Sequence, residues 1–157
     1  EQRNDYSYGL DNAKLWRYFR TTTPGRANGS STISGVAPPP HFNVRRGFFD
    51  SPFQLMLSCE LSGATIRYTV DGSEPAELSG LVYTAPLLVA NTTIFRAAAF
   101  QTGFLPSTIE THTYIFLEQV IHQPAQPPGV PTNWISLDGA NWPADYEMDP
   151  EIVANPL

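Results

Sequence analysis

Three acidic residues lie close together in the segment ATIRYTVDGSEPAELSG, residues 64–80. Asp71, Glu74 and Glu77 could ligate a metal ion, supply the acid and base of a hydrolase, or form a polar turn. A helix-loop-helix calcium loop needs acids at alternate positions, then a Gly and a later Glu, and this spacing is absent. Two catalytic carboxylates must face each other across a cleft, which one flexible turn does not provide. The pattern favours a polar turn, with a metal site of Asp71, Glu74 and Glu77 as the alternative.

The residues beside these acids predict a loop between two strands. Asp71-Gly72 directly follows TIRYTV and is a strong turn signal, because Gly tolerates a positive φ and Asp bonds to its own backbone. Pro75 stops further ladder hydrogen bonding. An exposed loop therefore accounts for the three acids, since their charges stay solvated there.

Motifs of the common enzyme classes are absent from the sequence. It contains no G-x-S-x-G, no phosphate-binding P-loop, no H-E-x-x-H and no C-x-x-C. His41, His112 and His122 are scattered, and such histidines are more often surface or hydrogen-bonded residues than ligands. Cys59, the one cysteine, lies on the apolar side of its segment, so we expect a buried, inert thiol. We predict that the chain is not an enzyme and has no catalytic residue, resident metal or cofactor.

Composition indicates a β-rich protein with many turns. Charged residues make up 15% of the 157 residues, and the chain contains 15 Pro and 11 Gly. The net charge is -6, which argues against a nucleic-acid partner because phosphate binding needs several cations. No apolar run is long enough to span a bilayer.

The middle of the chain shows the period-two alternation of strands with one buried face. The predicted inward residues are Phe53, Leu55, Leu57 and Cys59 in FQLMLSCE, Ile66, Tyr68 and Val70 in TIRYTV, and Phe95, Ala97 and Ala99 in TTIFRAAAF. Shorter strands are predicted at HFNV, LVYT, LLVA and HTYIFL. About seven short strands with turns between them predict an all-β, immunoglobulin- or fibronectin-III-like sandwich.

Differences in composition and hydrophobic pattern divide the chain into three parts. Residues 1–35 combine an aromatic segment with a linker, which predicts the remnant of a preceding domain. Residues 36–117 carry the sandwich, and residues 118–157 form a Pro-rich segment leading toward a following domain. Both flanks are expected to be extended and irregular. Asp149 before Pro150 predicts a helix N-cap. Because the sequence starts at Glu1, we expect a processed product or a fragment.

Three phrases in the middle of the chain resemble the chitobiase/β-hexosaminidase C-terminal type domain. They are GATIRYTVDGSEP at residues 63–75, YTAP at residues 83–86 and RAAAF at residues 96–100. The resemblance implies an immunoglobulin-like accessory domain with no catalytic residues of its own. YFRTTTPGRANG resembles the end of a lamin-tail domain, and TYIFLEQVIHQP to DYEMDPEIVANP resembles the join ahead of a spore-coat-protein-H-like kinase domain.

Two functions are open at this point. The favoured one is a structural or spacer module of a large exported, bacterial cell-surface protein, whose partners are neighbouring domains or chains. The alternative is a carbohydrate-binding accessory module with polysaccharide as partner, since Trp16, Trp134 and Trp142 could stack on sugar rings. Exposed rings in a planar row would favour the sugar binder, whereas buried rings would favour the spacer.

Overall fold

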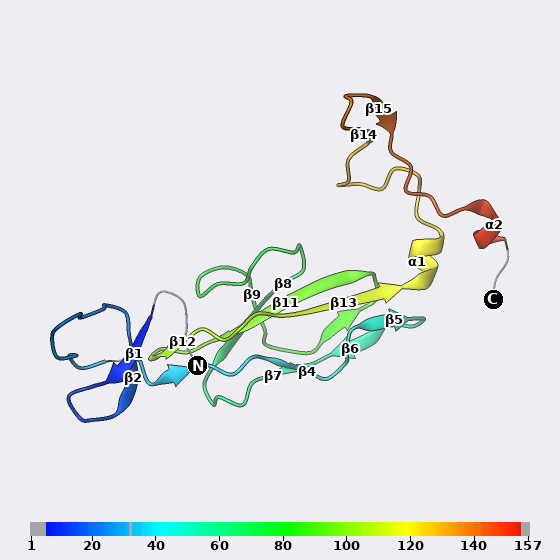
Figure 1. Ribbon diagram of the computed structural model, residues 1–157. Coiled ribbons are helices and arrows are strands. Elements are labelled where there is room, and N and C mark those ends of the chain that lie inside the picture. Colours follow the sequence, from blue (N-terminus) through cyan, green and yellow to red (C-terminus); the bar gives the residue numbers. More distant parts are fainter. Residues whose placement is uncertain (1–5, 32, 155–157) are drawn as a thin grey trace. The chain divides into compact units, whose positions relative to one another are not determined.

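The computed structural model describes residues 6–31 and 33–154, and short strands dominate them (Figure 1). The first strands are β1 (Ser7–Leu10), β2 (Trp16–Phe19), β3 (Gly35–Val36), β4 (His41–Phe42), β5 (Gly47–Phe49), β6 (Phe53–Leu55) and β7 (Leu57–Ser58). They are followed by β8 (Thr65–Thr69), β9 (Leu81–Val82), β10 (Leu87–Val89), β11 (Thr93–Phe100), β12 (Phe104–Leu105) and β13 (Glu110–Phe116). The remaining elements are α1 (Leu117–Ile121), β14 (Asn133–Ile135), β15 (Asn141–Pro143) and α2 (Pro150–Val153). Within these residues, no helix has the length and apolar character needed to cross a membrane.

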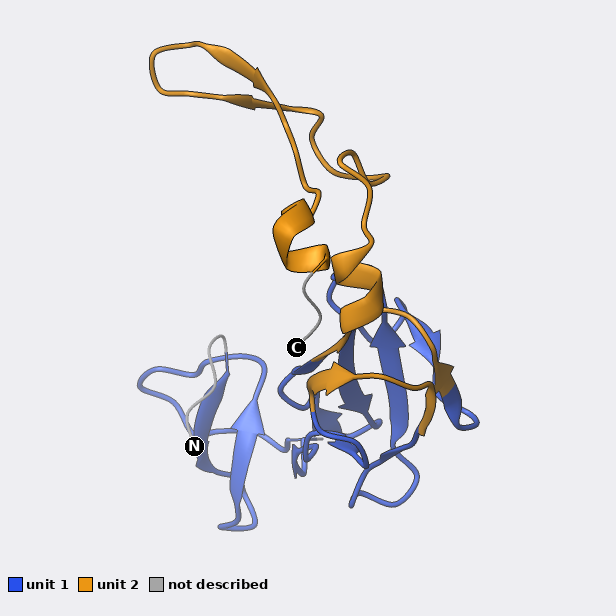
Figure 2. Cartoon of the chain, turned by 90° about the vertical axis from the view of Figure 1, so that its right-hand side faces the viewer, with its two compact units in different colours: residues 1–45, 55–87, 94–112 blue, residues 46–54, 88–93, 113–157 orange. Residues whose placement is uncertain are grey.

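The chain divides into two compact units (Figure 2). Unit 1 contains residues 1–45, 55–87 and 94–112, and unit 2 contains residues 46–54, 88–93 and 113–157. The largest sheet has the strand order β5-β13-β11-β8-β9, and two-stranded pairings join β6 with β10, β4 with β7 and β3 with β12. The predicted all-β, sandwich-like class is confirmed.

The segment FQLMLSCE alternates as predicted, but it forms two strands instead of one. Leu55 and Leu57 are buried, whereas Met56 between them is exposed. Strand pairing breaks at Met56, whose backbone N–H donates to the side-chain oxygen of Asn43 at 2.6 Å. The strand therefore changes partner at this residue, from β10 to β4. This partner change accounts for some of the strands beyond the predicted seven.

Strand β8 is shorter than predicted, and one inward residue was wrong. Ile66 and Tyr68 are buried, but Val70 is exposed and Thr69 is buried in its place. The strand ends at Thr69, whose hydroxyl donates to the carbonyl of Ser73 at 2.6 Å. This hydrogen bond satisfies the buried hydroxyl and turns the chain before Val70 can continue the alternation.

Strand β11 is buried on both faces toward its C-terminal end. The predicted inward residues Phe95, Ala97 and Ala99 are buried, and so are Ala98 and Phe100 on the opposite face. β11 pairs antiparallel with β8, with Ala99 opposite Ile66 and Phe100 opposite Thr65. The small alanines allow other chain segments to approach both faces closely.

Both flanks are mostly irregular, but each contains one hairpin. β1 pairs with β2, and Tyr18 also bridges to Ile33. β14 pairs with β15 in unit 2, with Trp134 directly opposite Trp142. Near the end of the chain, Asp149 accepts from the backbone N–H of Glu151 with Pro150 at the first helical positions, which confirms the predicted N-cap of α2.

Helix α1 is fastened within unit 2 by one side chain. The Gln119 carboxamide nitrogen donates to the Ala90 carbonyl and to the Asn91 side-chain oxygen. Its oxygen accepts from the Thr92 backbone N–H at 2.7 Å. Gln119 thus uses both ends of its amide on the turn between β10 and β11.

Candidate functional site

The three acids of the opening segment have three different environments. Asp71 closes a turn, because its Oδ1 accepts from the backbone N–H of Ser73 at 3.0 Å and from its hydroxyl at 2.6 Å. Both hydrogen bonds lower the pKa of Asp71, and the bond from the Ser73 hydroxyl has the larger effect. Gly72 follows with a φ of 81°, a conformation that other L-residues rarely adopt. This is the polar turn that the sequence predicted at Asp71-Gly72.

Glu74 is held by an arginine from strand β11. Arg96 approaches the Glu74 carboxylate at 2.9 Å and also donates to the Gly72 carbonyl at 2.8 Å. The Glu74 side chain is largely exposed, so solvent screens the ion pair. Arg96 therefore braces the loop through a backbone carbonyl and a carboxylate together.

Glu77 lies farther along the loop and lines a cleft. The loop runs from the turn at Asp71 to Gly80, and a backbone bridge joins Ala76 and Ser79 on either side of Glu77. Among the residues that the structure describes, Glu77 takes part in no ion pair. The cleft beside it has a volume of about 390 Å³ and is also lined by Arg67, Phe100 and Gln101.

A shared metal site at the three acids receives no support from this arrangement. Asp71 and Glu74 are engaged by Ser73 and Arg96, while Glu77 faces the cleft. Across residues 6–31 and 33–154, no group of three or more His, Cys, Asp or Glu side chains is placed to hold a metal ion. A metal-free loop stays a prediction, which calcium titration can test.

The remaining reactive side chains are dispersed. His112 stacks on Phe42 with ring centroids 4.1 Å apart, and His122 lies 3.4 Å from Glu118 one helical turn earlier. Cys59 is half-buried, less than predicted, and its thiol donates to the Pro38 carbonyl at 3.5 Å.

Three aromatic rings pack one on another in the N-terminal hairpin. Tyr18 is buried in a small cluster with Ile33 and Leu105, and Tyr8 packs against it with ring centroids 4.8 Å apart. Trp16 stacks on Tyr8 at 5.2 Å and is 60% exposed. The cross-strand register makes this possible, because Tyr8 lies opposite Tyr18 and diagonal to Trp16. The predicted contact residue Trp16 is therefore anchored on one face and open on the other.

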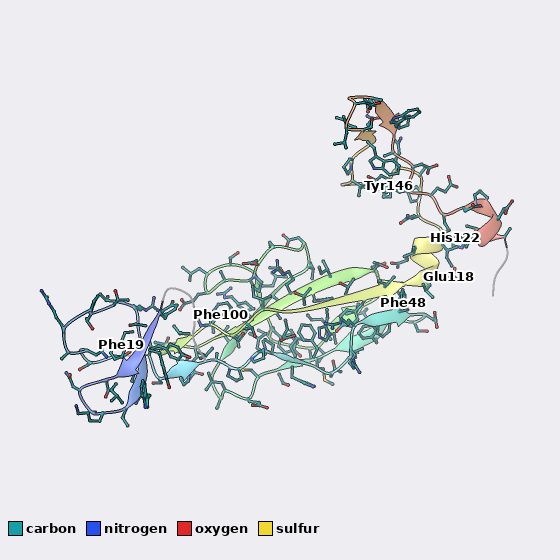
Figure 3. All side chains as sticks on the ribbon, viewed as in Figure 1. Phe19, Phe48, Phe100, Glu118, His122 and Tyr146 are labelled. Atoms are coloured by element: carbon teal, nitrogen blue, oxygen red, sulfur yellow. The ribbon has the colours of Figure 1, made fainter. Side chains whose placement is uncertain are left out.

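The C-terminal hairpin presents the two other tryptophans. Trp134 makes an edge contact with Tyr146, and the two ring centroids are 5.6 Å apart. Tyr146 is labelled in Figure 3. Trp142 is 62% exposed, and no ring of the described residues stacks on it. Ile135 and Leu137 beside them are also exposed. The loop of this hairpin resembles the turn at Asp71, because an acid in it accepts hydrogen bonds from a serine hydroxyl and a backbone N–H. The bond from the Ser136 hydroxyl lowers the pKa of Asp138 most, and the bond from the Ala140 N–H lowers it further.

The sequence reasoning missed the cleft beside Glu77. Its walls come from β8, from the loop at residues 71–80 and from the turn after β11, so no contiguous motif marks it. The available signal was Arg67 on the outward face of TIRYTV, next to a predicted loop rich in acids.

Comparison with known proteins bears on the central segment. No curated protein and no solved structure was found to match the chain. The resemblances of the two flanks to lamin-tail and spore-coat-protein-H-like regions stay predictions. Residues 44–113 match the family model of the chitobiase/β-hexosaminidase C-terminal domain, an immunoglobulin-like, non-catalytic domain, as the phrases within this segment predicted.

Proposed function

We propose that the chain is a non-catalytic structural module of a large exported bacterial protein and contacts neighbouring domains through its two hairpins. One hairpin belongs to the end of a lamin-tail-like domain, and the other leads toward a spore-coat-protein-H-like region. The matched family supports the non-catalytic accessory role for residues 44–113. Its partners are neighbouring domains or chains of the same cell-surface assembly.

All three tryptophans are at least 50% exposed, so they are not buried as the sequence argument for a spacer expected. The proposal is supported instead by the placement of exposed apolar side chains on the two hairpins. Both hairpins lie outside the matched residues 44–113, one before and one after them in the sequence. An isolated two-stranded hairpin is marginally stable in water and gains stability when its apolar face is covered. The exposed large apolar residues are Tyr8, Leu10, Leu15 and Trp16 in the first hairpin and Trp134, Ile135, Leu137 and Trp142 in the second. Surfaces of this composition are typical of contact sites between proteins.

Tryptophan fluorescence tests the proposal directly, because all 3 tryptophans of the chain lie on the hairpins. We expect acrylamide to quench all of them in the isolated chain. In a large multidomain protein of the kind proposed, quenching of the same tryptophans should fall and their emission should shift to the blue. Trp16→Phe removes the fluorescence of the N-terminal hairpin, so that the signal of the C-terminal hairpin can be measured by itself. Tryptophans outside residues 1–157 are first replaced by Phe. Equal quenching in both contexts would show that the hairpins stay uncovered, contrary to the proposal.

A carbohydrate-binding role of the hairpins is the second candidate. It is supported by Trp142, whose exposed ring is not stacked on another ring of the described residues, and by the Tyr8–Trp16 stack. Affinity electrophoresis in gels containing soluble polysaccharides tests this candidate. Retardation that Trp142→Ala or Trp16→Ala abolishes would support it, whereas unchanged mobility in every gel would exclude sugar binding by the hairpins.

A further inference from the structure

A polar cleft lies at one end of the β8–β11 ladder in unit 1. The turn before β8 contributes Gly63, and the turn after β11 contributes Gln101 and Thr102. The loop at residues 71–80 supplies Glu77 on a third side. The cleft is open to solvent and has a volume of about 390 Å³, within the range of small-molecule sites.

The loop at residues 71–80 is fixed to the rest of the unit, so the cleft is a built feature of the fold. Arg67 donates to the Gly80 carbonyl at 2.9 Å, and Arg96 donates to the Gly72 carbonyl at the other end of the loop. Thr69 donates to Ser73, and Pro75 is buried. Three side chains of the two strands thus hold the loop that carries Glu77.

The lining combines hydrogen-bond donors, acceptors and one aromatic ring. Its chemistry-bearing residues are Thr65, Arg67, Glu77, Phe100, Gln101 and Thr102. Arg67 uses one guanidinium nitrogen on Gly80, so its other N–H groups stay available to a ligand. Phe100, labelled in Figure 3, is a buried apolar wall at the end of β11.

Gln101 is the second observation that points to a ligand. In the described part of the chain, its side-chain oxygen is the one buried side-chain polar atom without a hydrogen-bond partner. Buried polar groups are nearly always satisfied by protein, water or a bound molecule. The oxygen is covered in this structure, so a ligand in the cleft would accept from the carboxamide nitrogen or draw the oxygen outward to donate to it.

The balance of groups defines the ligand class. One cation and one anion line the cleft, so a phosphate meets the Glu77 carboxylate and a simple cation meets Arg67. Two hydroxyls, a carboxamide, a guanidinium and a carboxylate match a molecule whose groups both donate and accept. The hydroxyls of a sugar do so, and Phe100, which is 8% exposed, adds only a small apolar surface beside them. We propose that this cleft binds one neutral sugar residue.

A second hollow extends the same site. It shares Glu77, Phe100, Gln101 and Thr102 with the first, has a volume of about 310 Å³, and also reaches Arg20 and Phe104. The sugar site thus has room to continue beyond one residue. The first cleft contains no residue of either hairpin, so its existence depends neither on their contacts with neighbouring domains nor on sugar binding by Trp16 or Trp142.

Nuclear magnetic resonance of the ¹⁵N-labelled chain tests the cleft. Methyl glucoside and N-acetylglucosamine are added to millimolar concentration, with glucuronate as a charged comparison. We expect saturable shifts at the backbone amides of Thr65, Arg67, Gln101 and Thr102 with the neutral sugars. Weaker binding of glucuronate is expected, because Glu77 repels a carboxylate.

Variants then assign the binding to the cleft. Glu77→Ala or Gln101→Ala should each raise the dissociation constant about tenfold, the usual effect of losing one or two ligand hydrogen bonds. Glu74→Gln is the matched control, because Glu74 is on the same loop outside the cleft and a glutamine oxygen still accepts from Arg96, so binding should be unchanged. Absence of saturable shifts with every sugar, equal losses in Glu74→Gln, or binding abolished by Trp142→Ala would each overturn the proposal. Amide spectra of the variants without sugar verify that each is folded.

Discussion

Truncation of the central residues of FQLMLSCE measures how much stability the alternation provides. Leu55 has 0% and Met56 49% of its surface exposed, although they are adjacent. Leu55→Ala removes three carbons, or about 2.4 kcal/mol at about 0.8 kcal/mol per buried methylene. The resulting cavity adds to this, so we expect a total loss of about 2–5 kcal/mol in the free energy of unfolding. Met56→Ala also removes three heavy atoms, but because half of the side chain is already in water, we expect a loss of about 1 kcal/mol.

Urea unfolding followed by far-ultraviolet circular dichroism gives both values. The slope of the free energy against urea concentration must be equal in the two variants, because a changed slope indicates a changed unfolded state. Leu57→Ala, on the same buried face, should behave like Leu55→Ala. A loss for Met56→Ala equal to that for Leu55→Ala would refute the assignment of opposite faces. Melting temperatures serve as the readout if Leu55→Ala is too unstable for a urea baseline.

Three further outcomes are expected. Glu74→Gln should change the free energy of unfolding by less than about 1 kcal/mol, because the ion pair of Glu74 is exposed. Calcium should not raise the melting temperature of the parent chain. A calcium-dependent rise that Glu74→Gln loses would instead indicate a metal site. Burial raises the pKa of Tyr114 to about 12 from 10.0, so its contribution to stability is complete below pH 10 and is lost as pH rises toward about 12; the alkaline stability profile should flatten in Tyr114→Phe, and a profile identical to that of the parent would contradict this. The thiol of Cys59, half-buried and bonded to a carbonyl, should react with a thiol reagent more slowly in the folded chain than in urea, and equal rates would show an exposed thiol.

Local patterns predicted the parts of the fold that depend on one buried face. Alternation correctly placed Leu55 and Leu57 inward, because a strand with one solvated face must repeat every second residue. It failed at Val70, where a hydrogen bond from the Thr69 hydroxyl ends the strand, and periodicity carries no information on such bonds. Strand β5 was not predicted, since its parallel pairing with β13 joins residues 47–49 to residues 114–116 without a turn between them.

The C-terminal hairpin shows how a turn signal can be outweighed by proline. Asp138-Gly139 marks a turn, but Pro131 and Pro143 predicted an extended segment. Backbone hydrogen bonds join Ser136 with Ala140 and Ala144 with Thr132. By the alternation of an antiparallel ladder, Pro143 then occupies a non-hydrogen-bonded position, where its missing N–H costs nothing.

The candidate cleft was beyond sequence reasoning for a different reason. Glu77 was recognised as one of three neighbouring acids, and this grouping suggested that the three act together. In the structure Glu77 shares the cleft lining with Arg67 and Gln101, which lie 10 and 24 residues away in the sequence. The pairing of β8 with β11 brings Arg67 and Gln101 to one end of a sheet, and hydrogen bonds from Arg67, Thr69 and Arg96 hold the loop that carries Glu77.

The attachment of Gln119 to the turn between β10 and β11 has a mechanical consequence. A force that pulls on the C-terminal segment passes through α1 before it reaches strand β13. The three hydrogen bonds of the Gln119 carboxamide, to Ala90, Asn91 and Thr92, would resist that force first. Stretching in optical tweezers should therefore show an early yielding event that Gln119→Ala removes, while the later rupture of the sheet is unchanged. One side chain would then yield to the applied force before the strands of the sheet do.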